Sequence, residues 1–301
     1  MSLSLRILAF ALFCVSAIAG AQIPRITSGT ISHYEKFDSK YVDARNIDVW
    51  LPEGYGPGEK YSVIYMQDGQ TLFDDQDADH PGWKIDERIS ELVSERRLGK
   101  CIVVAIASSP KWRWSEYFPQ GALKYMAPDV RADVFETSLM SLPQSDNYLH
   151  FLTKELMPFI GKRFNVYKDP KHNILAGSSM GALISLTALC EYPKLFGGAI
   201  CMSTHWQGTQ KNSDAVAQAI QDYFRAKLPK GKEHRLYFDH GTVDMDAGYK
   251  PWQDMMDLNS LRLGYGLKNY ASRTFEGEGH SAAFWGKRFH YALEFMLGAA
   301  R

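Results

Sequence analysis

The sequence has no surplus of either charge, and this limits the partners that the chain is expected to have. Its 34 Lys and Arg residues balance 34 Asp and Glu residues, and no basic run or repeat is visible. Nucleic acids and anionic membranes are bound mainly through an excess of positive charge. We therefore expect neither as a partner of the whole chain.

Cysteine is also scarce, with four residues in 301. Cys14 lies in the N-terminal leader described below, so Cys101, Cys190 and Cys201 remain, an odd number. Their spacing is not that of a metal site. Cys101 and Cys201 fall in apolar, strand-like runs, where a buried free thiol is expected, and one disulfide is the alternative.

Long apolar runs are absent except at the N-terminus. Arg6 precedes an apolar stretch from Ile7 to Val15, and the small residues Ala19-Gly20-Ala21 follow. This order is typical of a secretory signal peptide. A membrane anchor is the alternative, but the run is short for a span. We expect residues 1–21 to be removed, and residues 22–301 to work in the periplasm or as a secreted protein without stable membrane insertion.

Strand-like and helix-like segments alternate along the rest of the chain. Residues 26–51 alternate between apolar and polar and predict early antiparallel strands. Later apolar runs predict buried strands at 61–66, 101–107, 173–176, 198–202, 235–239 and 270–275. Helical spacing lies between most of them, and no linker interrupts the pattern. The sequence thus predicts a single α/β domain over residues 22–301, with a mostly parallel central sheet and helices on both faces.

The most informative stretch joins the predicted strand at 173–176 to an alanine-rich helix. Between them lies Gly177-x-Ser179-x-Gly181, the spacing of a nucleophile elbow. Such a turn exposes the serine hydroxyl, and glycines leave room where a Cβ would clash. The following helix directs its N-terminal amides at the site, which favours a developing negative charge. An ordinary strand-to-helix turn with a capping serine is the bland alternative.

A serine nucleophile needs a histidine base and a carboxylate that orients it, in the chain order Ser, Asp or Glu, His. The histidines after Ser179 are His205, His234, His240, His280 and His290. Of these, His280 follows the last predicted strand on a glycine-flanked loop and is the expected base. The acid should follow the strand at 235–239, where Asp239, Asp244 and Asp246 are candidates. We expect Asp244, because the Gly241-Thr242 turn can project it toward the histidine, with Asp246 as the fallback.

The oxyanion of the tetrahedral intermediate needs two backbone donors. The amide of Met180 is one, and the loop after the strand at 61–66 should supply the other, for which we choose Gln70. Residues 108–146 show little periodicity and leave the carboxyl end of a central strand, where α/β sheets bind ligands. We expect Trp112, Trp114 and Tyr117 of this loop to contact substrate, together with Trp206. A surface excursion packed on its own aromatics is the alternative.

These motifs resemble a known family. The segments concerned are Tyr65–Phe73, Gly177–Gly181, Tyr192–Phe196, Gly241–Asp244 and Gly279-His280. Together they look like the putative-esterase family, which contains enterochelin-type siderophore esterases, feruloyl and acetylxylan esterases, S-formylglutathione hydrolase and mycolyltransferases. The resemblance covers nearly all of the mature chain. It implies an α/β-hydrolase fold, the nucleophile Ser179, the acid Asp244 and the base His280, and it supports Gln70 as an oxyanion donor.

The sequence therefore predicts a secreted or periplasmic serine esterase that needs no metal or organic cofactor. Its substrate would be a small-molecule or carbohydrate-linked carboxylic ester. An acyltransferase on the same fold is one alternative, since an alcohol can replace water as the acceptor. A catalytically inactive binding protein is the other.

Overall fold

The structure is a computed structural model that describes residues 23–74 and 81–299, so the predicted leader at 1–21 lies outside it. The strands are β1 (Thr30–Phe37), β2 (Arg45–Leu51), β3 (Ser62–Gln67), β4 (Cys101–Ile106), β5 (Asn173–Ser178), β6 (Gly198–Met202), β7 (Arg235–Gly241) and β8 (Tyr270–Phe275). The α-helices are α1 (Ile85–Ser94), α2 (Arg113–Tyr117), α3 (Pro128–Asp133), α4 (Ser145–His150), α5 (Met157–Arg163), α6 (Met180–Glu191), α7 (Asp214–Lys227), α8 (Lys250–Arg262) and α9 (Ala282–Leu297). Shorter or wider helical turns are η1 (Gly69–Thr71), η2 (Gln120–Tyr125), η3 (Val134–Leu139), η4 (Phe151–Leu156), η5 (Pro170–His172) and η6 (Asp244–Gly248).

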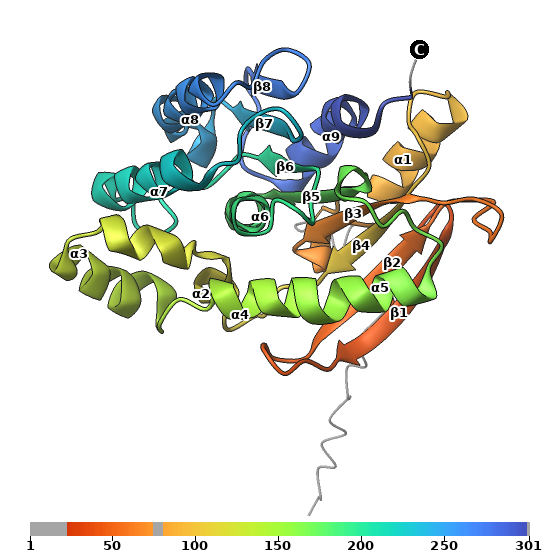
Figure 1. The fold of residues 1–301 in the computed structure, drawn as a ribbon, viewed down its shortest axis with the longest axis horizontal. Helices are drawn as coiled ribbons and strands as arrows, with labels where there is room; N and C mark the ends of the chain where they lie inside the picture. The colour runs from red at the N-terminus through yellow and green to blue at the C-terminus, as the bar shows by residue number, and fades with distance from the viewer. Residues whose placement is uncertain (1–22, 75–80, 300–301) are drawn as a thin grey trace, which may run out of the picture.

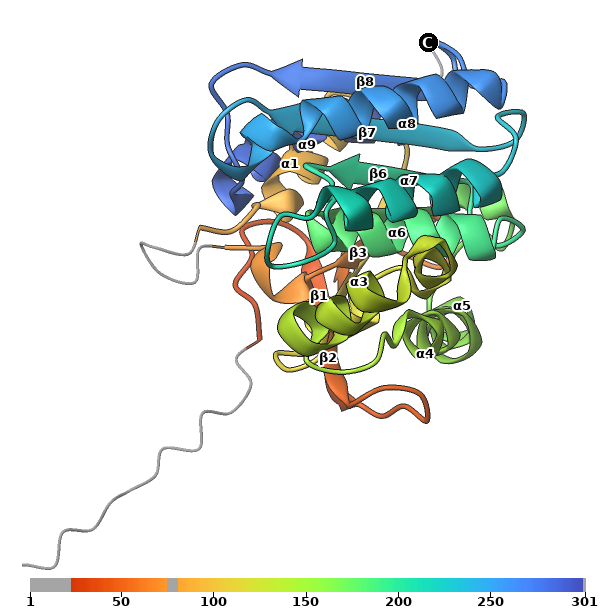
Figure 2. The same cartoon turned by 90° about the vertical axis from the view of Figure 1, so that its left-hand side faces the viewer.

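The strands form one twisted sheet in the order β1-β2-β4-β3-β5-β6-β7-β8 (Figure 1), and Figure 2 shows β6, β7 and β8 side by side at one end of it. β1 and β2 are antiparallel to their neighbours, whereas the six strands from β4 to β8 in the sheet are mutually parallel. All six therefore end at the same edge of the sheet. The order reverses at β3, which lies between β4 and β5, and ligands bind at such switch points. The predicted mostly parallel sheet is confirmed.

Both faces of the sheet are covered, which explains why β3 to β6 are apolar without alternation. On β3, Val63 and Tyr65 belong to one core, and Ile64 and Met66 to the other. Helices α1 and α9 pack on the second face, and α6, α7 and α8 pack on the first (Figure 1). In the part of the chain that the structure describes, no helix is long and apolar enough to cross a membrane. Cys101, Cys190 and Cys201 are buried free thiols.

The segment at 108–146, expected as an irregular loop, is instead mostly helical. It contains α2, η2, α3 and η3 and enters α4, none of them longer than six residues. α3 continues directly into the π-helical η3, and η2 is a 3-10 helix, so the number of residues per turn changes along the segment and no sustained 3.6-residue periodicity appears in the sequence. The segment forms a helical cap that projects beyond α6 and α7 (Figure 1).

Candidate active site

Ser179 occupies the turn that was predicted for it, between β5 and α6. Its backbone has φ 55° and ψ −125°, a strained conformation for a residue with a Cβ. A Cβ at Gly177 would lie 2.5 Å from the backbone carbon of Gly181, and one at Gly181 would lie 2.9 Å from Asp68 Oδ2. Both positions of the motif therefore require glycine, because neighbouring atoms lie too close to leave room for a side chain. The turn leaves Ser179 half-buried at the carboxyl edge of the sheet.

The carboxylate that contacts His280 belongs to Asp246, which corrects the expectation for Asp244. His280 Nδ1 lies 2.7 Å from Asp246 Oδ1, and Asp246 is fully buried. Asp244 is exposed on the outer side of the same turn. Asp246 turns inward because its other oxygen, Oδ2, accepts a 2.7 Å hydrogen bond from the Gly241 amide. An ionised Asp246 requires the proton of His280 to lie on Nδ1, which leaves Nε2 free to accept one.

Ser179 and His280 reach the same edge from β5 and β8, and a chain of contacts connects them. The amide of His205 donates to the Ser179 carbonyl at 3.3 Å. The Tyr249 hydroxyl lies 2.7 Å from His205 Nδ1, and the Tyr249 ring packs edge-on against His280 at 5.8 Å between centroids. Among residues 23–74 and 81–299, no hydrogen bond joins the Ser179 hydroxyl to His280. Such contacts are often long without substrate and tighten in its complex.

His205 itself is a fixed, neutral histidine. Its Nε2 lies 2.7 Å from the Thr209 carbonyl, so this nitrogen carries the proton and Nδ1 accepts from Tyr249. Burial lowers the pKa of His205 to about 4. It is therefore a structural support of the Ser179 turn and a poor candidate for the base.

Ser203, which follows β6, holds the second oxygen of Asp246. Its hydroxyl lies 2.5 Å from Asp246 Oδ2, 2.9 Å from Trp285 Nε1 and 2.7 Å from a guanidinium nitrogen of Arg288. The Trp285 and Arg288 groups can only donate, so the single proton of the hydroxyl goes to Asp246. Burial raises the pKa of Asp246, but the hydrogen bonds from His280, Ser203 and Gly241 outweigh burial, and the net shift is downward. Asp246 is thus held as an anion.

Arg288 lies behind this arrangement, almost fully buried, and faces three carboxylates. It lies 3.0 Å from Asp239, 3.3 Å from Glu278 and 3.6 Å from Asp246. One guanidinium cannot neutralise all three, and burial raises the pKa of Asp239 to about 7 despite the ion pair.

Ser203 and Arg288 were not among the site residues predicted from the sequence. For Arg288 a signal existed, because it has the spacing of the buried residues Ala292 and Met296 of α9.

The expected oxyanion donors lie next to Ser179 and at the end of β3. Met180 is the first residue of α6, and amides in a first helical turn have no partner within the helix. Gln70 lies in η1 directly after β3, and its side chain forms two hydrogen bonds with Ser108, at 2.9 and 3.1 Å. Their roles as oxyanion donors stay predictions.

The four aromatic residues expected to contact substrate divide into two pairs. Tyr117 and Trp206 are fully buried, so the expectation for them is wrong. Trp206 packs on Phe238 at 6.0 Å between ring centroids and serves the core. Trp112 and Trp114 are partly exposed, and the Trp114 ring lies edge-on to His205 at 5.7 Å. These two remain candidates for a substrate-binding wall.

Arg113, between the two tryptophans, forms a two-pronged ion pair with Asp68 beside the elbow. Its Nε lies 2.6 Å from Asp68 Oδ1, and a terminal nitrogen lies 2.8 Å from Oδ2. Because Asp68 also borders Gly181, this pair fixes the helical cap against the N-terminus of α6.

Comparisons with known proteins bear on the family and the fold of this chain. The chain is 28% identical over 275 residues to the Bacillus subtilis protein YjcH, covering 90% of this chain and 98% of that protein. Among solved structures, the BES protein from Bacillus cereus superposes with a TM-score of 0.65 at 17% identity, covering 92% of this chain and 98% of that one. The enterobactin esterase FES from Shigella flexneri gives a TM-score of 0.64 at 15% identity, over 91% of this chain and 60% of that one. A ferulic acid esterase superposes with a TM-score of 0.63 at 17% identity, covering 91% of this chain and 99% of that one.

These structural likenesses show that the fold is that of an α/β-hydrolase. The family described as "Putative esterase" matches residues 40–296, which is most of the chain. The chain therefore belongs to this esterase family.

Proposed function

We propose that the protein is a secreted or periplasmic serine esterase that hydrolyses carboxylic esters through an acyl-enzyme. The observation that carries this proposal is the bond between buried Asp246 and His280, at the same sheet edge as the strained Ser179 turn. This is the arrangement that an activated serine requires, with a base oriented by an anionic carboxylate.

Each residue has a defined role in the proposed reaction. The Ser179 hydroxyl attacks the ester carbonyl while His280 Nε2 takes its proton, and Asp246 stabilises the imidazolium that results. The Met180 and Gln70 amides hold the oxyanion. The intermediate then collapses, His280 protonates the departing alcohol, and Ser179 keeps the acyl group. Water, deprotonated by His280, attacks the acyl-enzyme and releases the acid. These steps need no metal or organic cofactor.

Polysaccharide-linked acetyl or feruloyl esters, and siderophore esters, are the substrate classes that we propose. Two of the structurally similar proteins are a ferulic acid esterase and an enterobactin esterase by name. Partly exposed Trp112 and Trp114 supply flat apolar surface on which an aromatic acid or a sugar ring would stack. A screen of purified protein on acetyl, feruloyl and siderophore esters would identify the class.

The mechanism is tested by covalent labelling with a fluorophosphonate, followed by mass spectrometry of the labelled peptide. We expect the label on Ser179 and none in Ser179→Ala, whose kcat should fall about a million-fold. Ser178→Ala is the matched control, because it changes the adjacent serine at the end of β5. Labelling of another residue, or near-normal hydrolysis by Ser179→Ala, would contradict the proposal. Transfer of the acyl group to an added sugar, in preference to water, would indicate the acyltransferase instead.

Export is tested separately. The apolar N-terminal run and the small residues at 19–21 support cleavage before residue 22. The intact mass of the protein recovered from the periplasm or the medium should equal that of residues 22–301. Recovery of the full-length chain from the cytoplasm would contradict this part of the proposal.

A further inference from the structure

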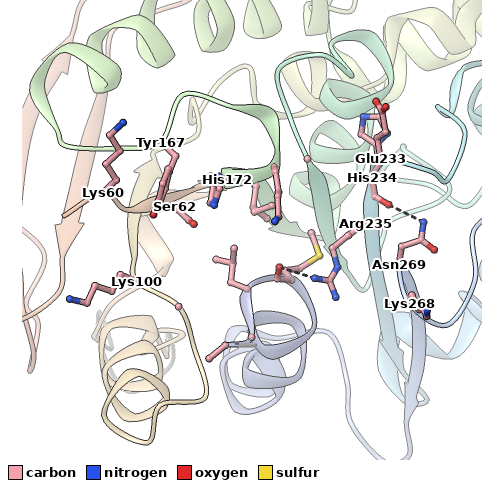
Figure 3. Close-up of a pocket in the computed structure, with 18 of the residues that line it drawn as sticks. Lys60, Ser62, Lys100, Tyr167, His172, Glu233, His234, Arg235, Lys268 and Asn269 are labelled. Carbon is pink, nitrogen blue, oxygen red and sulfur yellow. Dashed lines mark hydrogen bonds between the residues drawn. The ribbon is translucent and has the colours of Figure 1, made fainter. Parts of the chain in front are cut away.

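A hollow lies at the opposite edge of the sheet from Ser179. It encloses about 970 Å³ and is bordered by the amino ends of parallel strands, including Ser62 of β3 and Arg235 of β7, and by the end of α9 (Figure 3). A strand of six residues is about 20 Å long, so this hollow is well separated from the site of ester cleavage. Nothing in the proposed reaction uses it.

Positive charge is concentrated around this hollow. Its cationic lining residues are Lys60, Lys100, Lys171, Lys232, Arg235 and Lys268, and its acidic ones are Glu59 and Glu233. The lining thus has four more positive than negative charges, although the whole chain has equal numbers of both. Lys60 and Lys100 lie on one side of the hollow and Lys268 on the other, with Arg235 between them (Figure 3).

Most of these charges have no partner within the part of the chain that the structure describes. Lys100 pairs with Glu59. Lys60, Lys171, Lys232 and Lys268 are exposed and make no ion pair or hydrogen bond through their side chains with any described residue. Like charges gathered around a hollow repel one another, and an anion bound among them relieves that repulsion.

Arg235, which also lines the hollow, forms no ion pair with any residue that the structure describes. Its one hydrogen bond to a described residue is long, 3.4 Å to the Met296 carbonyl, and its guanidinium carbon lies 4.8 Å from the centre of the Phe295 ring. Burial lowers the pKa of Arg235. A guanidinium in this state is a ready donor to an anionic oxygen.

The shape and the kind of cation indicate which anion fits. A concave floor is out of reach of a flat lipid surface. The cations are mainly lysines from separate segments, whereas a compact phosphate is commonly gripped by converging arginine forks. Tyr167 stacks on His172 at 3.9 Å between centroids and gives one wall a flat aromatic surface, which suits a sugar ring. Charges spread along a chain of sugars match this lining.

We propose that this hollow binds a segment of an acidic polysaccharide, whose carboxylates pair with Lys171, Lys232, Lys268 and Arg235. Binding there holds the protein on the polymer and raises the local concentration of any ester attached to it. The inference does not depend on the catalytic mechanism, since binding is measured without turnover.

The test is titration calorimetry of the full mature protein with a short oligogalacturonide, which carries one carboxylate per sugar. A neutral cello-oligosaccharide of equal length is the uncharged control. The hollow variant combines Lys171→Gln, Lys232→Gln and Lys268→Gln. Its matched control combines Lys40→Gln, Lys162→Gln and Lys211→Gln, which remove the same charge from exposed lysines that do not line the hollow.

We expect the oligogalacturonide to bind and the neutral sugar not to bind. The hollow variant should lose affinity about tenfold, and the control variant should stay within about twofold of the original. Binding should weaken as ionic strength rises. Both variants should hydrolyse a small ester at the original rate, which shows that the fold is intact.

Three results would overturn the proposal. The first is no binding of the oligogalacturonide by the unaltered protein. The second is an equal loss of affinity in both variants, because the effect would then be one of net charge. The third is tighter binding to inorganic tripolyphosphate or to phosphatidylglycerol vesicles, which would identify a phosphate group or a membrane as the occupant.

Discussion

Asp244 and Asp246 belong to the same helical turn after β7, yet their carboxylates lie in opposite environments. Asp246 is fully buried and contacts His280 at 2.7 Å, whereas Asp244 faces solvent. The Asp244 carboxylate lies beside the backbone of Gly279, whereas Asp246 is the one that forms the hydrogen bond with the His280 ring.

The first prediction follows from this difference. Asp246→Asn should lower kcat about ten-thousand-fold, because the amide favours the imidazole tautomer that cannot accept the Ser179 proton. Asp244→Asn should retain nearly full activity and is the matched control. Steady-state kinetics on any cleaved ester checks both. A severe loss in Asp244→Asn with activity kept in Asp246→Asn would restore the assignment made from the sequence.

The sequence sufficed for features that depend on neighbouring residues. The strands, the elbow with Gly177 and Gly181, and the loop that carries His280 follow from local spacing and turn chemistry. The choice between Asp244 and Asp246 does not follow from local spacing. It depends on a tertiary contact, in which the Gly241 amide and the Ser203 hydroxyl draw one carboxylate inward.

The local sequence also does not show which aromatic side chains are buried. Tyr117 and Trp114 lie three residues apart in α2, but one is fully buried and the other partly exposed. A helix of five residues leaves too little pattern to tell its faces apart. Trp206 lies in the connection between β6 and α7, where no periodicity indicates burial, and its packing on Phe238 and Phe224 places it in the core.

The second prediction concerns acid stability. Burial lowers the pKa of His205 to about 4, below the usual ~6.5, so the unfolded chain takes up this proton before the folded one. The stability that depends on neutral His205 is therefore present above about pH 6.5 and is lost as the pH falls toward 4. Between pH 7 and pH 5 the loss should be about 2 kcal/mol.

Urea unfolding at the two pH values measures this loss. His205→Gln should remove it, since glutamine stays neutral. His290→Gln, which changes a partly exposed histidine that contacts the Lys287 carbonyl at 3.1 Å and the Tyr291 ring at 3.9 Å between centroids, should keep it. If His205→Gln loses as much stability on acidification as the unaltered protein, another group is responsible.

The third prediction concerns substrate size. Trp112 and Trp114 are partly exposed in the helical cap, and Trp114 lies against His205 near the elbow. Changing both to alanine should lower kcat/KM for a feruloyl ester about tenfold, through the loss of ~1–2 kcal/mol of ring contact. A small acetyl ester should be nearly unaffected, because it is too short to touch them. Equal losses on both esters would mean that the tryptophans support the fold, and no loss on either would remove them from the substrate site.

The last prediction concerns Ser203, which touches neither the ester nor His280 but donates to Asp246 Oδ2. Ser203→Ala removes one of the three donors that keep Asp246 anionic, so the pKa of Asp246 should rise. The variant also leaves Trp285 and Arg288 without their shared acceptor. A hydrogen bond to a charged group is worth about 1.5–3 kcal/mol, so kcat should fall about ten- to hundred-fold. KM should not change, since Ser203 contacts no substrate.

A second variant separates this effect from backbone strain. Ser203 has φ 43°, a value that glycine adopts readily and alanine does not. Ser203→Gly lacks the hydroxyl but relieves the strain, so it should lose as much kcat as Ser203→Ala while unfolding at a different urea concentration. In both variants the rate should begin to fall at a higher pH on acidification, because Asp246 is more easily protonated. A normal kcat and an unshifted pH profile in both would show that Asp246 keeps its charge and position without Ser203.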